Sequence, residues 1–316
     1  MDFKNFKQNY QKKEIDKFPN TVGKNPLLSV CVQTYEHENF ITQCLEGILM
    51  QKTNFTFEVL LGDDGSIDKT RQICLEYAKK YPEKIRLFLH HRENNIVING
   101  NPTGRFNLAY NIFSSNGQYI AICEGDDYWT DPYKLQKQVS FLESNKEYSL
   151  CFHHVKILTP LGVLTNDFIT KIPKKYQTLE NFAENGNYIH TPTVVFRNII
   201  KVFPLEFFYV SFGDYFLYFL LAKHGNFYCL KKNMAVYRYG LGVISKMNPK
   251  QILLNNMTLY TGLISNAPSD EIKKILLERQ KEIFDFYFER AAKKNHLSIR
   301  KQIRSAFRQV YQKFFS

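Results

Sequence analysis

The alternation of apolar and polar positions predicts a parallel α/β sheet in the first half of the chain. Four apolar runs have the length of buried strands, and the stretches that follow them place apolar residues at helical spacing. The predicted strands span residues 27–32, 57–61, 85–90 and 119–123, and the predicted helices span 38–50, 68–81, 105–115 and the stretch from Pro132 to about Asn145. Strands that alternate with helices through short links are typical of a doubly wound sheet.

The second half of the chain has a less regular pattern. Apolar runs predict strands at 148–158, within 188–197 and at 227–237, and a markedly apolar helix at 215–222, whereas residues 161–187 read as irregular. From about residue 249 the spacing is helical and strand signals are lacking. We therefore expect a polar basic leader at 1–25, one α/β domain at 26–248 with halves at 26–130 and 131–248, and a helical extension at 249–316.

Polar residues follow three of the predicted strands at the point where each strand ends. They are Gln33, Thr34, Tyr35 and Glu36 after the first strand, Asp63 and Asp64 after the second, and Glu124, Asp126 and Asp127 after the fourth. In doubly wound sheets, ligands bind outside the carboxyl ends of the strands. We therefore expect these clusters to form one shared site.

The cluster after the fourth strand places three carboxylates within four residues, at Glu124, Asp126 and Asp127. Packed together without a cation, such carboxylates repel one another and raise each other's pKa. A hard divalent cation such as Mg²⁺ or Mn²⁺ takes oxygen ligands and leaves positions open for substrate phosphates. The alternative is a solvated acidic turn. The position of the cluster beside the other polar loops favours a metal site.

The chain is basic, and the charge is concentrated near its end. The 316 residues carry a formal charge of +12, and residues 290–316 hold eight Lys or Arg and no Asp or Glu. Apolar residues fall at helical spacing between these charges, at Ile299, Ile303, Phe307, Val310 and Phe314. This pattern is typical of an amphipathic helix that lies on an anionic membrane, and the alternative is a helix docked on the domain or on a partner chain. Charge confined to the tail argues against a nucleic-acid partner.

Cysteine usage and hydropathy indicate a cellular setting. The six cysteines form no CxxC pair and lie mostly in apolar runs, as buried thiols in a reducing compartment do. The first residues have no apolar signal core, and no window approaches the roughly 18 apolar residues of a membrane-spanning helix. We expect a cytoplasmic protein, able to sit peripherally on the cytoplasmic face of the inner membrane. No sequence feature specifies an oligomeric state.

Five ordered motifs resemble the GT-A glycosyltransferases of family 2, and the resemblance covers residues ~27–245. They are Thr34-Tyr35-Glu36, Asp63-Asp64-Gly65-Ser66 with Asp68, Glu124-Gly125-Asp126-Asp127, Gly213-Asp214-Tyr215, and Val236-Tyr237-Arg238 with Gly240 and Gly242. The resemblance implies a GT-A fold with a mixed, mostly parallel sheet, in which 26–130 binds the nucleotide sugar and 131–248 binds the acceptor. It implies inverting, metal-dependent transfer from a nucleotide sugar, most often a UDP-sugar, to a hydroxyl of a saccharide or lipid-linked acceptor in surface glycan biosynthesis.

The same resemblance assigns the metal and nucleotide residues. Asp127 would contact Mn²⁺ or Mg²⁺, Asp126 would share the metal or hold the ribose, and Glu124 occupies a position where many members have an aspartate. The nucleotide residues would be Gln33, Thr34, Tyr35, Glu36, Asp63, Asp64, Arg105 and Asp126, with Tyr35 stacked on the base, Asp64 accepting from uracil N3–H and Arg105 on the diphosphate. The alternatives are core packing for Tyr35, a loop-holding role for Asp63 and a surface charge for Arg105.

The resemblance places the catalytic base at Asp214, which would take the proton of the acceptor hydroxyl. Apolar neighbours on both sides should raise the pKa of this carboxyl toward a useful value. An alternative or additional role is to cap the following helix. His190, Thr191 and Arg238 are weaker candidates for the acceptor side.

Three other functions fit the sequence less well. A sugar-nucleotide pyrophosphorylase would need a Gly-rich, Arg-containing loop after the first strand, and a dinucleotide-dependent dehydrogenase would need GxGxxG there. The sequence after that strand is Gln-Thr-Tyr-Glu-His-Glu, which is neither. A sugar-nucleotide-binding protein without transferase activity is the remaining alternative, although the retained carboxylates favour an enzyme.

Overall fold

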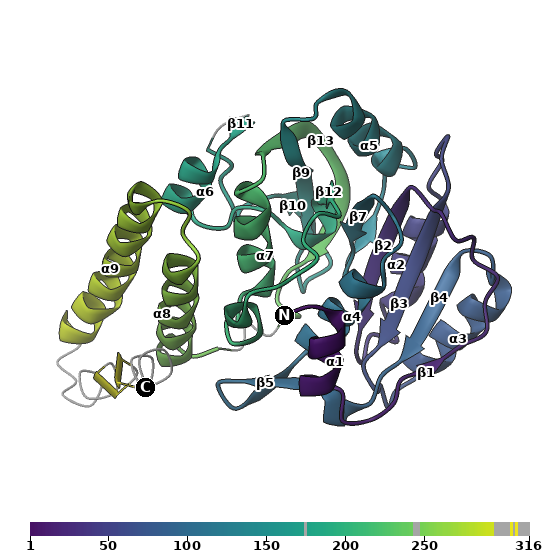
Figure 1. Cartoon of the computed structure of the whole chain (residues 1–316), viewed down its shortest axis with the longest axis horizontal. Helices are drawn as coiled ribbons and strands as arrows, with labels where there is room; N and C mark the ends of the chain where they lie inside the picture. Colours follow the sequence, from purple (N-terminus) through teal and green to yellow (C-terminus); the bar gives the residue numbers. More distant parts are fainter. Residues whose placement is uncertain (174–175, 243–246, 294–303, 306, 309–316) are drawn as a thin grey trace.

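The computed structural model describes residues 1–173, 176–242, 247–293, 304, 305, 307 and 308 (Figure 1). Its centre is an 11-stranded mixed sheet in the order β1-β4-β3-β2-β7-β12-β9-β13-β11, with β10 paired to β9 and β8 paired to β13. The predicted fold class, a mostly parallel sheet flanked by helices, is confirmed.

The first half of the domain forms the parallel part of this sheet. Its elements are β2 (Leu28–Thr34), α2 (Ile41–Leu49), β3 (Phe57–Asp63), α3 (Thr70–Lys80), β4 (Ile85–Leu89), α4 (Arg105–Ser114) and β7 (Tyr119–Ile122). β3 lies on one side of β2 and β7 on the other, both parallel to it. The chain thus reverses its direction of winding at β2, and the loops after β2 and β7 meet at that switch point.

The second half adds antiparallel strands. β12 (Val195–Arg197) runs antiparallel to both β7 and β9 (Tyr148–Leu158), and β13 (Asn226–Arg238) runs parallel to β9. The other strands are short: β8 (Tyr128–Trp129), β10 (Leu164–Asn166) and β11 (Tyr176–Gln177). The insertion of β12 joins the two halves into one continuous sheet.

Alternate residues of the central strands enter two hydrophobic cores on opposite faces of the sheet, as the period of a strand requires. Val30 and Val32 pack with α2, α3 and α5 (Lys134–Ser144), whereas Cys31 packs with α4 and α7 (Gly213–Ala222). Every residue of α7 except Asp214 is buried. This explains why the helix is apolar all round. All six cysteines are buried free thiols, as expected.

The leader at 1–25 is ordered, which the sequence did not predict. It contains α1 (Phe3–Tyr10) and β1 (Asp16–Lys17), and β1 pairs antiparallel with β4. Phe6 is fully buried and its ring stacks on Phe106 and Phe208. The aromatic residues of a mainly polar segment therefore anchor it to the core beside α4.

Short elements fill the connections. They are the 3₁₀ turns η1 (Arg92–Asn94), η2 (Thr191–Thr193) and η3 (Leu205–Phe208), the hairpin of β5 (Ile96–Ile98) and β6 (Asn101–Thr103), and α6 (Leu179–Asn185). The segment at 161–187, expected to be irregular, contains β10, β11 and α6. Its strands are edge pairings of two or three residues, too short for a periodic signal.

The extension is helical, as expected, and forms an antiparallel-looking pair at the end of the molecule away from α3 and β4 (Figure 1). Its helices are α8 (Pro249–Ser265) and α9 (Asp270–Lys293), and Asn248 and Gln251 form a capping box at the start of α8. Leu263 and Leu276 join the core that contains α7. Within the described residues, no helix is both long and apolar enough to cross a membrane. The predicted amphipathic tail at 290–316 lies almost wholly outside the described residues.

Candidate active site at the carboxyl edge of the sheet

The loops after β2, β3 and β7 are joined to one another by backbone hydrogen bonds. The Gly125 N–H donates to the Gln33 carbonyl and the Asp64 N–H donates to the Thr34 carbonyl, each over 2.9 Å. The predicted convergence of the three polar clusters on one edge is therefore what the structure shows.

Gly125 allows the acidic loop to approach the loop after β2. A Cβ at this position would lie 2.7 Å from the Thr34 Oγ1 and 2.8 Å from the His37 Nδ1. Those distances are too short for any side chain, so the Glu-Gly-Asp-Asp sequence needs glycine here.

The three predicted metal ligands lie together. Oxygens of Glu124, Asp126 and Asp127 all fall within 4.8 Å of one another. Asp127 is only 1% exposed; its Oδ1 accepts the Arg238 N–H over 2.9 Å, and its Oδ2 has no partner among the residues that the structure describes. Burial and the neighbouring Asp126 raise the pKa of Asp127 well above its usual range. A buried carboxylate oxygen without a donor is costly to keep, and a divalent cation with oxygen ligands fits this donor set.

Glu124 lies in the same loop, and its side chain is exposed. Partial desolvation by the protein around the loop, together with the charges of Asp126 and Asp214, raises the pKa of Glu124 to about 8. The carboxylate thus feels both the acidic loop and the residue predicted to be the base. The predicted metal ligands and the predicted base, Asp214, are therefore close enough to interact electrostatically.

Arg238 lies behind the acidic loop and is almost fully buried. Its guanidinium donates to the Asp126 carbonyl and to the Gln43 side chain, and it stacks between the rings of Phe40 and Tyr128. We expected this residue on the acceptor side. That role stays a prediction, and in the structure Arg238 fixes the backbone that carries the carboxylates.

The carboxylate of Asp64 forms a buried polar cluster with two residues that the sequence analysis missed. Its Oδ2 accepts from the Arg92 Nη1 over 2.9 Å and from the Asn95 Nδ2 over 2.8 Å, while its Oδ1 has no partner in the described part of the chain. The Arg92 guanidinium lies 3.9 Å from the centre of the Tyr35 ring. Arg92 and Asn95 follow β4, so the rule that ligands bind at carboxyl ends of strands would have found them.

Asp63 is fully buried and holds its own loop. It accepts from the Arg71 Nε over 2.6 Å, and its Oδ1 lies 3.4 Å from the Ser66 N–H. The Ser66 hydroxyl in turn accepts the Glu36 N–H over 3.0 Å, where Glu36 has a φ of 53°. These contacts favour the loop-holding alternative for Asp63. They also orient the turn that carries Tyr35.

Asp214 lies in the first turn of α7, and Phe212 is the N-cap. The alternative role of Asp214 as the N-cap residue is therefore wrong. The half-buried carboxylate accepts the Asn187 Nδ2 over 3.0 Å, and burial raises its pKa even though Arg105 and nearby N–H groups oppose the shift.

Arg105 does not lie on the surface at the start of α4. Its buried guanidinium donates to the carbonyls of Phe207, Val210 and Ser211. A Cβ on Gly213 would overlap it. The expected diphosphate contact does not match this position, because the donors are already bonded to the turn that precedes Asp214. Arg105 supports that turn instead.

His190 and Thr191 lie at η2, beside Tyr237. The His190 Nε2 is 3.0 Å from the Asp167 Oδ2, and the imidazole ring lies 4.9 Å from the Tyr237 ring. Burial raises the pKa of Tyr237, and the charges of Asp127, Glu124, Asp126 and Asp214 raise it further. Tyr237 therefore connects His190 with the carboxylates. Asp167 and Asn187 belong to a segment without a readable pattern, so no sequence signal pointed to them.

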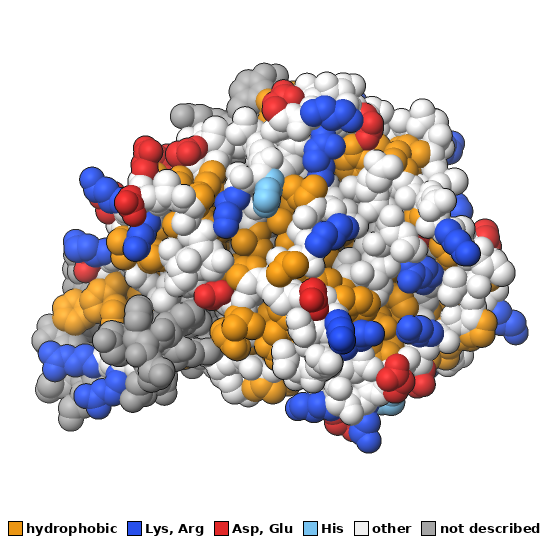
Figure 2. All heavy atoms as spheres, in the orientation of Figure 1, with side chains coloured by type: hydrophobic (Ala, Val, Ile, Leu, Met, Phe, Trp, Pro, Cys, Tyr) orange, Lys and Arg blue, Asp and Glu red, His pale blue; other side chains and the backbone are white. Residues whose placement is uncertain are grey.

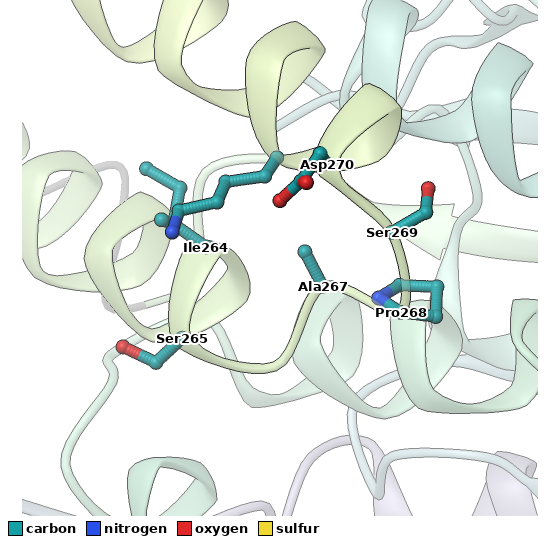
Figure 3. A pocket seen from close by; sticks show the side chains of 7 residues that line it. Ile264, Ser265, Ala267, Pro268, Ser269 and Asp270 are labelled. Atoms are coloured by element: carbon teal, nitrogen blue, oxygen red, sulfur yellow. The ribbon is translucent and has the colours of Figure 1, made fainter.

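A hollow of about 560 Å³ lies elsewhere, at the turn between α8 and α9 (Figure 3). Its lining residues are Ile264, Ser265, Ala267, Pro268, Ser269, Asp270 and Lys273. It contains none of the predicted site residues and one Asp and one Lys as its charged groups. We therefore place the candidate active site at the carboxyl edge of the sheet.

The fold and the site together are typical of a GT-A protein. The sheet is of the nucleotide-binding type, an acidic cluster lies at its switch point, and a carboxylate lies at the start of a buried helix. Residues 29–203 match the profile of Glycosyl transferase family 2, and the chain belongs to that family. It is similar to the uncharacterized protein Rv1520 of Mycobacterium tuberculosis, with 34% identity over 218 residues, or 67% of this chain and 58% of that protein. The chain thus spans less than two thirds of that relative.

Two solved structures share the fold. S. aureus TarS 1–349 in complex with UDP-GlcNAc has a TM-score of 0.62 and 21% identity, covering 90% of this chain and 80% of TarS. The mannosyltransferase PcManGT from Pyrobaculum calidifontis, in complex with GDP-Man and Mn²⁺, has a TM-score of 0.51 and 15% identity, covering 98% of this chain and 81% of that one.

Proposed function

We propose that the chain is an inverting, metal-dependent glycosyltransferase. It moves a sugar from a UDP-sugar to a hydroxyl of a saccharide or lipid-linked acceptor in surface glycan biosynthesis. The observation that carries this proposal is the grouping, at one sheet edge, of the Asp64 Oδ1, which is buried and has no hydrogen-bond partner within the described residues, with the acidic cluster and Asp214. The Asp64 oxygen suits the uracil base, the acidic cluster suits the diphosphate with its cation, and Asp214 suits the acceptor hydroxyl.

The contacts of the Asp64 cluster support a uridine nucleotide. Both donors on the Oδ2 come from protein, which leaves the Oδ1 to accept one hydrogen bond. Uracil offers an N3–H for that contact, whereas cytosine has an acceptor at N3. The stacked Arg92 and Tyr35 offer flat surfaces for a planar base. The TarS complex contains a UDP-sugar in the same fold, in keeping with this choice.

Glu124, Asp126 and Asp127 would hold the cation, Mn²⁺ or Mg²⁺. When bound, it neutralises the negative charge that develops on the diphosphate leaving group. Asp127 is the strongest ligand candidate because its buried Oδ2 has no partner within the described residues. The backbone N–H of Arg238 fixes the other oxygen of the same carboxylate, so that the free oxygen is already oriented.

Asp214 would act as the base. The acceptor oxygen forms a bond to the anomeric carbon as the bond from that carbon to the diphosphate oxygen breaks, and the hydroxyl proton passes to the Asp214 carboxylate. UDP leaves with the bonding electron pair. The amide of Asn187 and nearby backbone N–H groups orient the carboxylate, and Arg105 fixes the turn from the buried side.

Calorimetric titration with UDP, GDP and ADP, with and without Mn²⁺, tests the proposal together with UDP release from UDP-sugars. We expect UDP to bind most tightly and about tenfold or more tighter with Mn²⁺. Asp127→Asn should remove the Mn²⁺ dependence and reduce release, whereas Asp270→Asn, a carboxylate at the α8–α9 hollow, should change neither. Equal UDP affinity with and without Mn²⁺ would overturn the metal assignment. Pyrophosphate release from UTP and a sugar phosphate would instead support a pyrophosphorylase.

A further inference from the structure

Exposed hydrophobic side chains gather at one end of β9, β10 and β13. We define the apolar rim as Leu161, Val163, Leu164, Phe168, Ile169 and Tyr239. The exposed fractions of these residues run from 42% to 89%. Isolated exposed apolar side chains are ordinary, but a group on adjoining loops marks a contact surface. Figure 2 shows one face of the molecule, where hydrophobic side chains near the centre stand among Lys, Arg, Asp and Glu side chains.

The rim is one continuous surface. Leu164 begins β10 and pairs with Leu158 of β9, and the Tyr239 N–H donates to the Leu158 carbonyl over 3.0 Å. The Phe168 ring lies edge-on to the Tyr239 ring at 5.4 Å. The turn between β9 and β10 carries Leu161, the most exposed member. Three segments therefore present their apolar side chains at the same end of the sheet.

This surface borders the acceptor side of the candidate active site. Asp167, between β10 and Phe168, is bonded to His190, and His190 packs on Tyr237, which lies among the carboxylates. Two residues after Tyr237 the chain reaches Tyr239 in the rim. A ligand on the rim would therefore lie beside the place where the acceptor hydroxyl must enter.

The charge around the rim selects the occupant. Among the described residues 156–173, Lys156 and Lys171 are basic and Asp167 is the one acid, and the Asp167 carboxylate already accepts from His190 and Thr170. Exposed apolar tips among lysines match an anionic lipid surface, where the apolar groups enter the interface and the lysines meet head groups. A second copy of the chain fits less well, because a two-fold contact would bring the same lysines together.

We propose that the apolar rim docks on an anionic bilayer and turns the acceptor side of the site toward the membrane. The acceptor is then a lipid-linked saccharide, which deepens the proposed function and rests on it. This surface differs from the basic tail at 290–316. The donor side, around Asp64 at the end of β3, does not take part in docking, because β2, β7 and β12 lie between β3 and β9 in the sheet.

Co-sedimentation of the full chain with vesicles tests the proposal, using phosphatidylcholine with phosphatidylglycerol against phosphatidylcholine alone. The wild type should pellet with the anionic vesicles only. Leu161→Glu/Val163→Glu should weaken vesicle affinity about tenfold or more, since each new acid opposes both insertion and charge attraction. Val202→Glu, at an apolar residue 62% exposed and outside the rim, is the matched control and should keep wild-type affinity.

The other occupants give different results. If the rim variant pellets like the wild type while Lys301→Glu/Arg304→Glu does not, the tail is the membrane contact and the rim proposal is wrong. If light scattering shows a dimer for the wild type and a monomer for the rim variant, and the two have the same vesicle affinity, the occupant is a second copy and the membrane proposal is wrong. Mn²⁺-dependent UDP affinity, measured on the same preparations, reports the proposed function separately, so either idea can fail alone.

Discussion

The proposed donor side and the proposed acceptor side of this site are built differently. On the donor side, Asp63 and Asp64 are almost fully buried, and each carboxylate is already held by an arginine. On the proposed acceptor side, Asp214 is half-buried, and its one side-chain hydrogen bond among the described residues comes from the Asn187 amide. The difference teaches that a site for one fixed nucleotide can be preorganised, whereas a site for a larger acceptor is completed by the acceptor.

The two sides meet at Glu124. Its carboxyl extends from the acidic loop, and desolvation together with Asp126 and Asp214 raises its pKa. A charge change at Asp126 or at Asp214 should therefore change the pKa of Glu124. Variants that separate donor binding from transfer are the way to test whether the division is real.

The largest effect should come from Asp214→Asn, which keeps the size of the side chain and removes its ability to take a proton. We expect turnover to fall about 10³-fold while UDP affinity stays within about twofold of the wild type. Transfer in a single turnover and calorimetric UDP binding measure the two quantities. Transfer at the wild-type rate would mean that another group is the base. A matching loss of UDP affinity would mean that the two sides are not separable.

The next effect should come from Asp64→Asn, on the donor side. Because Arg92 and Asn95 both donate to the Oδ2, the amide oxygen should take that place and the NH₂ should take the place of the Oδ1. That NH₂ opposes uracil N3–H but suits the N3 acceptor of cytosine. UDP affinity should drop about 100-fold and the preference for UDP over CDP should reverse. A proportional loss for both nucleotides would contradict the contact.

The same contact predicts a pH dependence. Burial raises the pKa of Asp64 to about 6. The proton should sit on the Oδ1, since the Oδ2 already accepts two donors, and it would then oppose N3–H. The carboxyl is ionised above that pKa, so uridine affinity should be level above about pH 7 and fall toward tenfold per pH unit below about pH 6. Uridine without metal is the probe, because the acidic cluster also titrates. Asp64→Asn should show no such fall.

Much of the fold could be predicted because its strands are buried on both faces. The parallel strands read as continuous apolar runs, such as β2 and β3, and the links between them are short. β10 and β11 are edge pairings of two or three residues and carry no such signal. The leader was missed because its buried Phe6 stands among polar residues. The helix that carries Phe6, α1, is stabilised by tertiary packing against α4, and no local sequence pattern predicts such packing.

The positions of the site residues were predictable where a strand leads directly into them. Asp64 and Asp127 follow β3 and β7, so their edge of the sheet was fixed by topology. The direction in which a long side chain points was not predictable. Arg105 was expected to point at the diphosphate, yet it bonds to carbonyls about a hundred residues further along the chain. No local pattern encodes such a contact, and the same is true of the Asp167–His190 pair.

The smallest effect should come from His190 on the acceptor side. His190→Phe keeps a ring against Tyr237 and removes the contact with Asp167, which is about 1 kcal/mol of hydrogen bonding. If His190 orients the acceptor floor, the KM for the acceptor should rise about fivefold, whereas the KM for the donor should not change. Initial rates at varied donor and acceptor concentrations separate the two constants.

Asp167→Asn changes the other partner of the same hydrogen bond. It should therefore reproduce the rise in the KM for the acceptor, because it weakens that bond. The two changes together should then cost about as much as either alone, since each removes one shared interaction. Additive effects would mean that the two residues act independently. A rise in the donor KM would show that the floor of the acceptor side also shapes the nucleotide site, and the separation of the two sides would no longer hold.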